Sequence, residues 1–282
     1  MDIENILHKY DEMAASGQMQ AAVEYLEKMA AECVEEGKNT SAITIFNELE
    51  GFWRVAGEKE KSYAAAEAAL GLISSGQMEG SIGHATTLLN YATAKTAFGE
   101  AKEALELYDQ VEKIYDWQLP EDDYRYAGLY NNMAQSLLRV NDVKTAGEYF
   151  SKSLALLEKM QNVQSETATC HSNLAICLMA QKKLDEAREN LKKSEALFAE
   201  LPGDLHADSM LATRGQLEYM LGNYAEAAEY YKRAAFNIEK RFGRNPYYVR
   251  ACRNCAKALE AAGNTEEAER WQQLSDSAGE RR

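Results

Sequence analysis

The sequence predicts an all-α protein, an α-solenoid of about seven helix–turn–helix repeats. Three observations support this prediction. A pattern of small and bulky residues recurs every 40 to 42 residues, only three prolines occur in 282 residues, and Ala, Glu and Leu dominate the composition. Such a composition favours helices. A hairpin with one apolar face cannot bury that face alone, so we expect stacked copies that share a continuous core.

Each copy has a turn residue between two helices. These turn positions are Gly17, Gly57, Gly99, Asn141, Lys182, Gly222 and Gly263. Five of the seven are Gly and one is Asn, the residue types that most readily adopt the left-handed conformation needed at the end of a helix. Each repeat is therefore read as helix A, a tight turn, and helix B.

Both helices of a repeat carry packing positions at fixed distances from the turn. Five positions after the turn, helix B has a small residue: Ala22, Ser62, Ala104, Ala146, Ala187, Ala227 and Ala268. Nine positions after it stand mostly large apolar residues: Leu26, Ala66, Tyr108, Phe150, Leu191, Tyr231 and Gln272. In helix A, small residues lie seven positions before the turn in the last five copies: Ala92, Ala134, Ala175, Gly215 and Ala256. Eleven positions before it stand mostly bulky ones: Ile6, Phe46, Leu88, Tyr130, His171, Leu211 and Cys252. Residues four apart share a helix face, so each pair forms a knob beside a notch.

The repeat borders follow from the prolines, which occur only between repeats, at Pro120, Pro202 and Pro246. We expect one array over residues 1–282, with repeats at 3–42, 43–84, 85–126, 127–167, 168–207, 208–248 and 249–282. The first two copies are degenerate, because Glu50 and Ser62 occupy sites that should be small and apolar. The charged, amphipathic segment 265–282 is expected to cap the array.

This order of small, large and Gly sites resembles the tetratricopeptide repeat (TPR), and the longer period resembles the kinesin-light-chain subtype. The segments most similar to the family are "NLA" at Asn173–Ala175 and the stretch Phe242–Glu269. The resemblance implies a right-handed solenoid whose concave face binds protein or peptide, and a bacterial source. In the resembling families, asparagines on that face contact the main chain of the bound peptide.

Composition narrows the classes of function. No window is apolar enough for a transmembrane helix, and the acidic N-terminus does not fit a signal peptide. Five irregularly spaced cysteines fit a reducing compartment, so we expect a cytoplasmic protein. The net charge of −14 disfavours nucleic acid and anionic membranes as partners.

Catalytic and metal chemistry are not expected. Cys252 and Cys255 form a C-x-x-C pair, but they lie at packing positions of helix A, where buried cysteines behave as small apolar residues. Cys170 and His171 are adjacent, and His171 occupies a bulky packing site. No motif for a cofactor or a nucleophile occurs. An enzyme is retained only as a third reading, should these residues lie outside the packing register.

The other face of helix A is predicted to line a concave groove, at thirteen, ten, nine, six, three and two positions before each turn. Nine positions before the turn, an asparagine row runs through Asn90, Asn132, Asn173, Thr213 and Asn254. An amide can donate to and accept from an extended peptide backbone, or it can bond to the neighbouring repeat and set its orientation; both readings stay open. The predicted groove residues are Asn90, Asn131, Asn132, Arg139, Asn173, Met179, Tyr219, Arg250, Arg253, Asn254 and Lys257.

Charge suggests what the groove binds. In the last five copies, the groove sites carry Arg139, Arg250, Arg253 and Lys257 against Glu260, so its C-terminal end is basic. The first two copies carry Arg54 against three acidic residues, so the N-terminal end is acidic. We therefore expect a non-catalytic scaffold that binds a protein or peptide with an acidic or carboxylate-bearing segment.

Two alternatives concern regulation and assembly. The array also resembles bacterial pheromone receptors, which implies a peptide-sensing regulator; because the repeats begin almost at Met1, we expect no DNA-binding segment before them. An exposed groove or edge helix can also mediate self-association into a homo-oligomer, which a mass measurement in solution decides.

Overall fold

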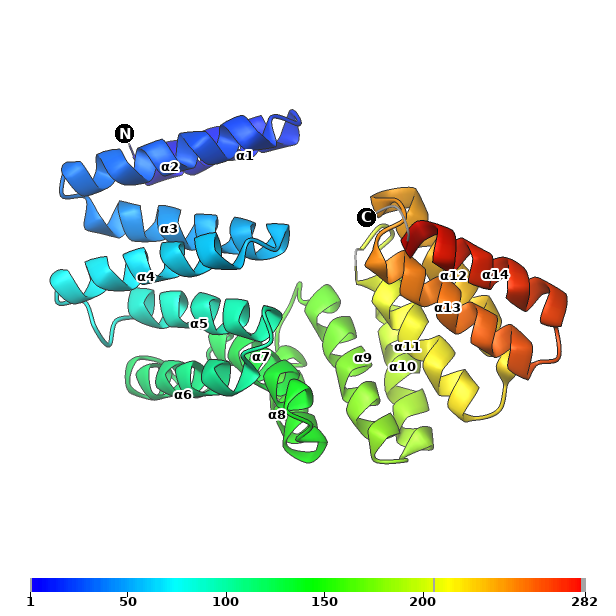
Figure 1. Ribbon diagram of the computed structural model, residues 1–282. Coiled ribbons are helices and arrows are strands. Elements are labelled where there is room, and N and C mark those ends of the chain that lie inside the picture. The colour runs from blue at the N-terminus through cyan, green and yellow to red at the C-terminus, as the bar shows by residue number, and fades with distance from the viewer. Residues whose placement is uncertain (1, 205, 280–282) are drawn as a thin grey trace. The chain divides into compact units, whose positions relative to one another are not determined.

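The computed structural model describes residues 2–204 and 206–279, which fold into α-helices without a strand (Figure 1). The predicted all-α solenoid of repeats is confirmed. The first helices are α1 (Ile3–Ala15), α2 (Met19–Glu35), α3 (Asn39–Ala56), α4 (Lys59–Ser75), α5 (Ile82–Ala97), α6 (Ala101–Gln118) and α7 (Arg125–Arg139). The others are α8 (Val143–Leu157), α9 (Gln164–Ala180), α10 (Leu184–Ala199), α11 (Ala207–Met220), α12 (Tyr224–Phe242), α13 (Pro246–Ala261) and α14 (Thr265–Gly279). Among the described residues, no helix combines the length and apolar character required to cross a membrane.

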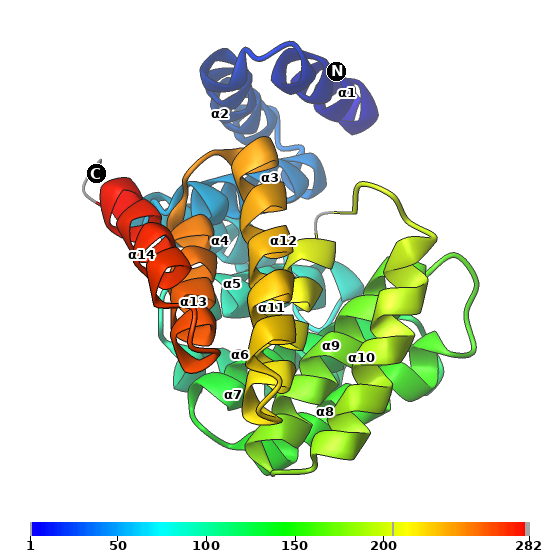
Figure 2. The same ribbon diagram turned by 90° about the vertical axis from the view of Figure 1, so that its right-hand side faces the viewer.

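The helices form two compact units, an N-terminal unit up to Asp142 and a C-terminal unit from Val143. The boundary falls between the two helices of the fourth predicted repeat, so α7 belongs to one unit and α8 to the other. The hairpins of the C-terminal unit can be followed in Figure 2. A single array over the whole chain stays a prediction.

Within each unit, odd-numbered helices are the A helices and even-numbered helices are the B helices. Each helix packs against the next within its unit, and A helices of consecutive repeats also touch: α1 with α3, α3 with α5, α5 with α7, and α9 with α11. No pair of B helices in the described part of the chain packs to the same extent. In these pairs the A helices lie closer together than the B helices of the same repeats.

The seven turn residues behave as the repeat predicts. All have a positive φ, from 64° at Lys182 to 92° at Gly99. At Gly222, the Gly222 N–H donates to Tyr219 O at 3.1 Å and the Asn223 N–H donates to Glu218 O at 2.9 Å. This pair of bonds satisfies carbonyls that the end of α11 would leave without partners. The left-handed turn is therefore the common device that reverses the chain between A and B helices.

The predicted packing sites form the core. All seven small sites of the B helices are buried, and so are the five notch sites of the A helices that begin at Ala92. The bulky sites Tyr108, Phe150 and Tyr231 are at most 4% exposed. At Gly215 the fit is tight, because a Cβ there would lie 3.0 Å from a ring carbon of Tyr231.

In the degenerate second copy, the two polar residues at the notch sites are buried and bonded to each other. Glu50 is 1% exposed and Ser62 is fully buried, and the Ser62 hydroxyl donates to Glu50 Oε1 at 3.3 Å. Arg54 Nε lies 3.4 Å from the same oxygen. Burial raises the pKa of Glu50 to about 7, although Arg54 and Ser62 favour its charged form. Two polar residues thus replace two apolar notch residues as a complementary pair.

Candidate functional site

The predicted groove residues fall on A helices of both units. In the N-terminal unit, Asn90, Asn131 and Asn132 are partly buried and Arg139 is exposed. In the C-terminal unit, Asn173 and Asn254 are partly buried, whereas Tyr219, Arg250, Arg253 and Lys257 are exposed. The structure thus supports two separate groups of surface residues, one on each unit.

Met179 is a correction to the predicted surface. Its side chain is 1% exposed and packs in the core of the C-terminal unit, so it does not line a groove. Met179 follows the buried notch residue Ala175 by four positions, which places both on the same helix face. Thr96 follows Ala92 in the same way and is also buried.

The asparagine row does not have one common role. Asn132 Nδ2 donates to Thr93 Oγ1 of the preceding repeat at 3.4 Å, and Asn132 Oδ1 accepts from Asn131 Nδ2 at 3.3 Å. A similar bond joins Asn47 to Thr87 across consecutive A helices, at 3.1 Å. These bonds favour the spacer role for Asn132. No hydrogen-bond partner is described for the side chain of Asn254, which leaves its amide available to a ligand.

Helix α13 combines a buried face with a basic one. Its start is fixed by Asn245, whose Oδ1 accepts from the Tyr248 N–H at 3.0 Å, and by Pro246 in the first turn. Cys252 and Cys255 face the core. The opposite face carries Arg250, Arg253 and Lys257, each separated from the next by about one helical turn.

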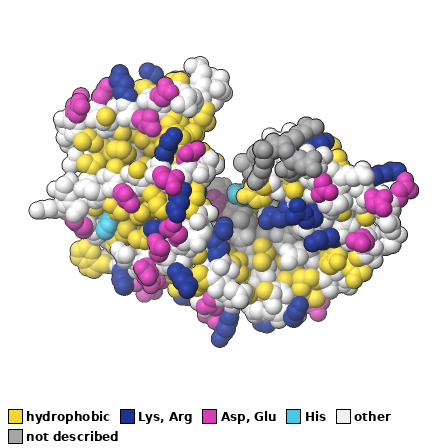
Figure 3. Space-filling model, viewed as in Figure 1, with side chains coloured by type: hydrophobic (Ala, Val, Ile, Leu, Met, Phe, Trp, Pro, Cys, Tyr) yellow, Lys and Arg dark blue, Asp and Glu magenta, His cyan; other side chains and the backbone are white. Residues whose placement is uncertain are grey.

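We define the α13 surface as Tyr247, Arg250, Arg253, Asn254 and Lys257. Tyr247 is 62% exposed, and the Arg250 guanidinium lies 5.4 Å from its ring centroid. Arg250, Arg253 and Lys257 have no acidic partner within the described part of the chain. Lys and Arg side chains gather over α13 in the space-filling view (Figure 3). The α13 surface is thus a row of uncompensated cations beside an exposed aromatic ring.

The sequence around the α13 surface is also basic. Residues 241–257 hold five basic residues and no acidic one. Two of the five are engaged elsewhere: Arg241 lies 3.5 Å from Asp208, and Arg244 lies 2.7 Å from Glu239. The α13 cations are therefore free to meet an anionic ligand, which charge-assisted hydrogen bonds would hold.

Two groups of paired charges escaped the sequence analysis, and the first of them is buried. In α11, Arg214 and Glu218 form an ion pair of 3.0 Å, and Asn223 Nδ2 donates to Glu218 at 2.8 Å. Arg214 also lies over the ring of Tyr230. The i, i+4 spacing of Arg214 and Glu218 was the available signal. This pair joins the end of α11 to the start of α12, so we assign it a structural role.

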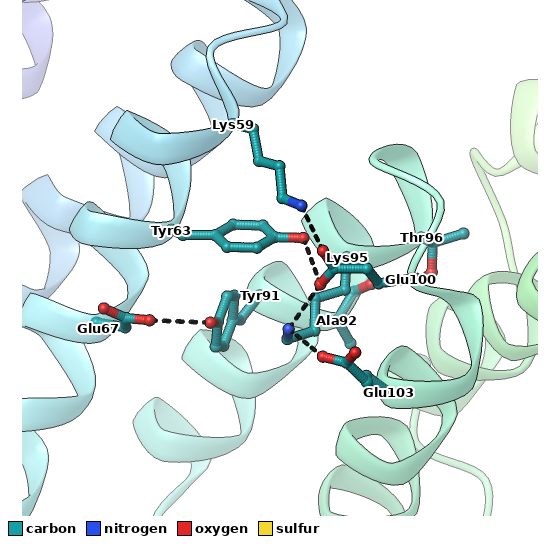
Figure 4. A network of polar contacts seen from close by, with 9 residues as sticks. All are labelled: Lys59, Tyr63, Glu67, Tyr91, Ala92, Lys95, Thr96, Glu100 and Glu103. Carbon is teal, nitrogen blue, oxygen red and sulfur yellow. Dashed lines mark hydrogen bonds and ion pairs between the residues drawn. The ribbon is translucent and has the colours of Figure 1, made fainter.

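The second group is a polar network in the N-terminal unit (Figure 4). Glu100 accepts bonds from Lys59, Lys95 and the Tyr63 hydroxyl, so one carboxylate joins α4, α5 and the α5–α6 turn. Lys59 and Lys95 lower the pKa of Glu100 to about 2. Tyr91 donates to Glu67 at 3.2 Å in the same region. The network ties the second repeat to the third.

The cysteines and His171 belong to the core, as predicted. All five cysteines are unpaired and buried, and burial raises the pKa of Cys255 to about 12. His171 is 3% exposed, its Nδ1 lies 2.8 Å from Asn190 Oδ1, and burial lowers its pKa. Within residues 2–204 and 206–279, no group of acidic, His or Cys side chains has the arrangement of a metal site.

Comparison with known proteins gives a consistent picture. The tetratricopeptide-repeat family model matches residues 125–200 and 166–235, whereas no curated protein matches the sequence. Kinesin-light-chain repeats of Podospora anserina are similar in structure, with 19% identity and a TM-score of 0.56 over 68% of this chain and 93% of that one.

Two regulators also share the fold. The quorum sensor NprR from B. thuringiensis, in its apo form, is 14% identical, with a TM-score of 0.68 over 100% of this chain and 77% of that one. The Rap conjugation gene regulator of plasmid pLS20, in complex with the Phr* peptide, is 14% identical, with a TM-score of 0.62 over 90% of this chain and 73% of that one. At these identities the likeness concerns the fold.

Proposed function

We propose that this chain, whose residues 125–200 and 166–235 match the tetratricopeptide-repeat family model, acts as a non-catalytic scaffold that binds an acidic peptide segment on the α13 surface. The observation that carries the proposal is the row Arg250, Arg253 and Lys257, which stays uncompensated in a protein of net charge −14. Leaving three cations exposed on one helix face has no packing reason, because the core lies on the opposite face. Binding of an anionic partner would explain why the three cations share this face.

The spacing of the cations suggests the pattern of the ligand. From Arg250 to Lys257 the helix rises about 10 Å, and an extended chain covers that distance in about three residues. A segment with acidic residues three positions apart would therefore meet both ends of the row. A C-terminal carboxylate can take the place of one acidic side chain.

Neighbouring groups would add contacts that do not depend on charge. Asn254, between the cations, can donate to and accept from the main chain of the bound peptide. Tyr247 offers an exposed ring beside Arg250, and Tyr219 of α11 is 38% exposed. We expect the binding to take place in the cytoplasm, because all five cysteines are unpaired.

A second candidate function is the sensing of a signalling peptide by a regulatory protein. The observation that favours it is the fold shared with NprR and with the peptide-bound Rap regulator over most of this chain. The two candidates predict different ligands: a scaffold would bind an acidic segment within a protein, whereas a sensor would bind a free short peptide.

A selection of displayed peptides tests the proposal. A library of random peptides, about eight residues long to exceed the three-residue span of the cations, would be selected in parallel on the wild-type chain and on Arg250→Glu/Arg253→Glu. Arg233→Glu/Lys240→Glu is the matched control, because it reverses two exposed cations on α12 of the same unit. Far-UV circular dichroism would verify that each variant is folded.

We expect acidic sequences from the wild type and from the α12 control, and their loss with the α13 variant. Their binding should also weaken with added salt. Peptides without acidic residues, or equal recovery of acidic peptides on the α13 variant, would contradict the proposal.

A further inference from the structure

The end of α6 and the loop that joins it to α7 expose two large aromatic side chains. Trp117 is 80% exposed and Tyr124 is 67% exposed. Trp and Tyr are the residues that most often dominate the binding energy of protein interfaces. Two such rings left to solvent within eight residues point to a surface that is covered by a partner.

The same segment is acidic. Residues 116–124 comprise the last three residues of α6 and the loop before α7, and are named here the acidic loop. They contain Asp116, Glu121, Asp122 and Asp123 and no basic residue. Asp116 accepts from the Tyr126 hydroxyl at 2.9 Å, and Asp123 pairs with Arg125 at 2.8 Å. Glu121 and Asp122 are exposed, and no partner is described for either carboxylate. Two adjacent carboxylates are therefore available beside the aromatic rings.

Hydrogen bonds hold the acidic loop in one conformation. The Asp123 N–H donates to Pro120 O at 3.0 Å, which closes a turn around Glu121 and Asp122. Asp123 Oδ1 accepts from the Arg125 N–H at 3.0 Å, and Gln118 donates to Gly80 O at 3.0 Å. A loop that is already ordered loses less conformational entropy on binding.

We propose that the acidic loop of one copy of this chain docks on the α13 surface of a second copy. The inference rests on the proposed function of the α13 surface and names one ligand for it. Charge favours this occupant: the acidic loop offers Glu121 and Asp122, and the α13 surface offers unpaired Arg250 and Arg253. Consecutive Cα atoms are about 3.8 Å apart, close to the rise of about 4.5 Å between Arg250 and Arg253.

The aromatic rings complete the match. Trp117 presents a ring face that attracts guanidinium groups, as the Tyr124 ring already attracts Arg125 and the Tyr247 ring attracts Arg250. Because the two docking surfaces differ, the contact is heterologous. A dimer joined by one such contact keeps one free surface of each kind, so association continues beyond a dimer unless a ring closes.

The test is the mass of the full-length chain in solution, measured by light scattering from about 10 µM to about 1 mM, the range expected for a weak interface. At about 0.05 M salt, we expect the mass to rise above 31.6 kDa with concentration. At about 0.5 M salt, it should return to that of the monomer, because screening removes the attraction. Trp117→Ala should weaken the association at least about tenfold.

Charge reversal identifies the two surfaces. Glu121→Lys/Asp122→Lys and Arg250→Glu/Arg253→Glu should each remain monomeric alone. An equimolar mixture should associate again, because each reversed surface then meets a partner of opposite charge. The control Arg233→Glu/Lys240→Glu should behave as the wild type. Far-UV circular dichroism confirms the fold of every variant.

A wild-type chain that stays monomeric at every concentration would overturn the inference, and so would association of the loop variant alone or a mixture that fails to associate. Peptide binding by Arg250→Glu/Arg253→Glu tests the proposed function independently of self-association. If the wild type is monomeric while Arg250→Glu/Arg253→Glu still loses acidic peptides, only the self-association is wrong. If that variant keeps acidic peptides, the α13 surface itself is wrongly assigned.

Discussion

Gly215 offers a sharp test of how the repeats pack. It lies inside α11, where Ala would normally stabilise a helix by about 1 kcal/mol relative to Gly. At this position, however, a Cβ would lie 3.0 Å from Cε1 of Tyr231 and 3.1 Å from its Cδ1 and Cζ. Tyr231 is 4% exposed, so its ring cannot move freely away. Crowding of this kind costs about 1–3 kcal/mol in a packed core, so we expect Gly215→Ala to destabilise the chain by about 1 kcal/mol.

Gly147 is the matched control in the same unit. It is buried inside α8, but a Cβ there would meet Gln181 at 3.5 Å and Cys177 at 3.6 Å, which are ordinary contact distances. Gly147→Ala should therefore gain most of the helix preference and stabilise by about 0.5–1 kcal/mol. Urea unfolding followed by far-UV circular dichroism would measure both free energies.

The difference between the two variants is the decisive quantity. We expect about 2 kcal/mol, the sum of the net loss at Gly215 and the gain at Gly147. A smaller side chain opposite Gly215 should recover part of the loss, so Gly215→Ala and Tyr231→Leu should couple by about 1 kcal/mol in a double-mutant cycle. If Gly215→Ala stabilises the chain as much as Gly147→Ala does, the close packing of notch and knob is not what holds these helices together.

Three further predictions concern single residues. Lys182 has a φ of 64°, which costs a non-Gly residue about 1 kcal/mol. Lys182→Gly should raise the free energy of unfolding, measured in urea, by a similar amount. A lower free energy of unfolding would contradict the turn assignment. Burial raises the pKa of Glu50 from 4.5 to about 7. The stabilising contribution of the protonated side chain is therefore complete below pH 4.5 and is lost as the pH rises through about 7, by up to about 3 kcal/mol. Glu50→Gln should remove that slope from thermal unfolding curves, and an unchanged slope would refute the assignment. Lys59 and Lys95 lower the pKa of Glu100 from 4.5 to about 2, so its contribution is present above pH 4.5 and is lost as the pH falls towards 2. Because these side chains are partly exposed, Glu100→Gln should destabilise by about 1 kcal/mol at pH 7 and by less at pH 3; equal effects at both values would exclude the ion pairs as the cause.

The elements that the sequence predicted best depend on local chemistry. A turn residue must reach a positive φ whatever surrounds it, so Gly57, Asn141 and Gly263 could be identified from residue type and spacing alone. The notch residues were equally visible, because the close approach of two helices requires a small side chain at a fixed distance from the turn. The burial of Cys252 and Cys255 followed from the same register.

What the sequence did not reveal depends on contacts between distant residues. Met179 was assigned to the surface, but its relation to Ala175 places it in the core. The bonds of Glu100 to Lys59 and Lys95 arise only when two repeats stack, and no periodic pattern marks them. The exposure of Trp117 was also invisible, since an aromatic residue near the end of a helix is more often buried than left in water.

The central claim, that the α13 surface binds an acidic segment, is tested most directly by hydrogen exchange. Backbone exchange of the full-length chain would be compared with and without an acidic peptide taken from the selection on the wild type. We expect slower exchange in α13, with α12 and α14 unchanged, because the proposed contacts lie on α13 alone. Protection confined to α12 and α14, or none in α13 at a peptide concentration that saturates binding, would contradict the account.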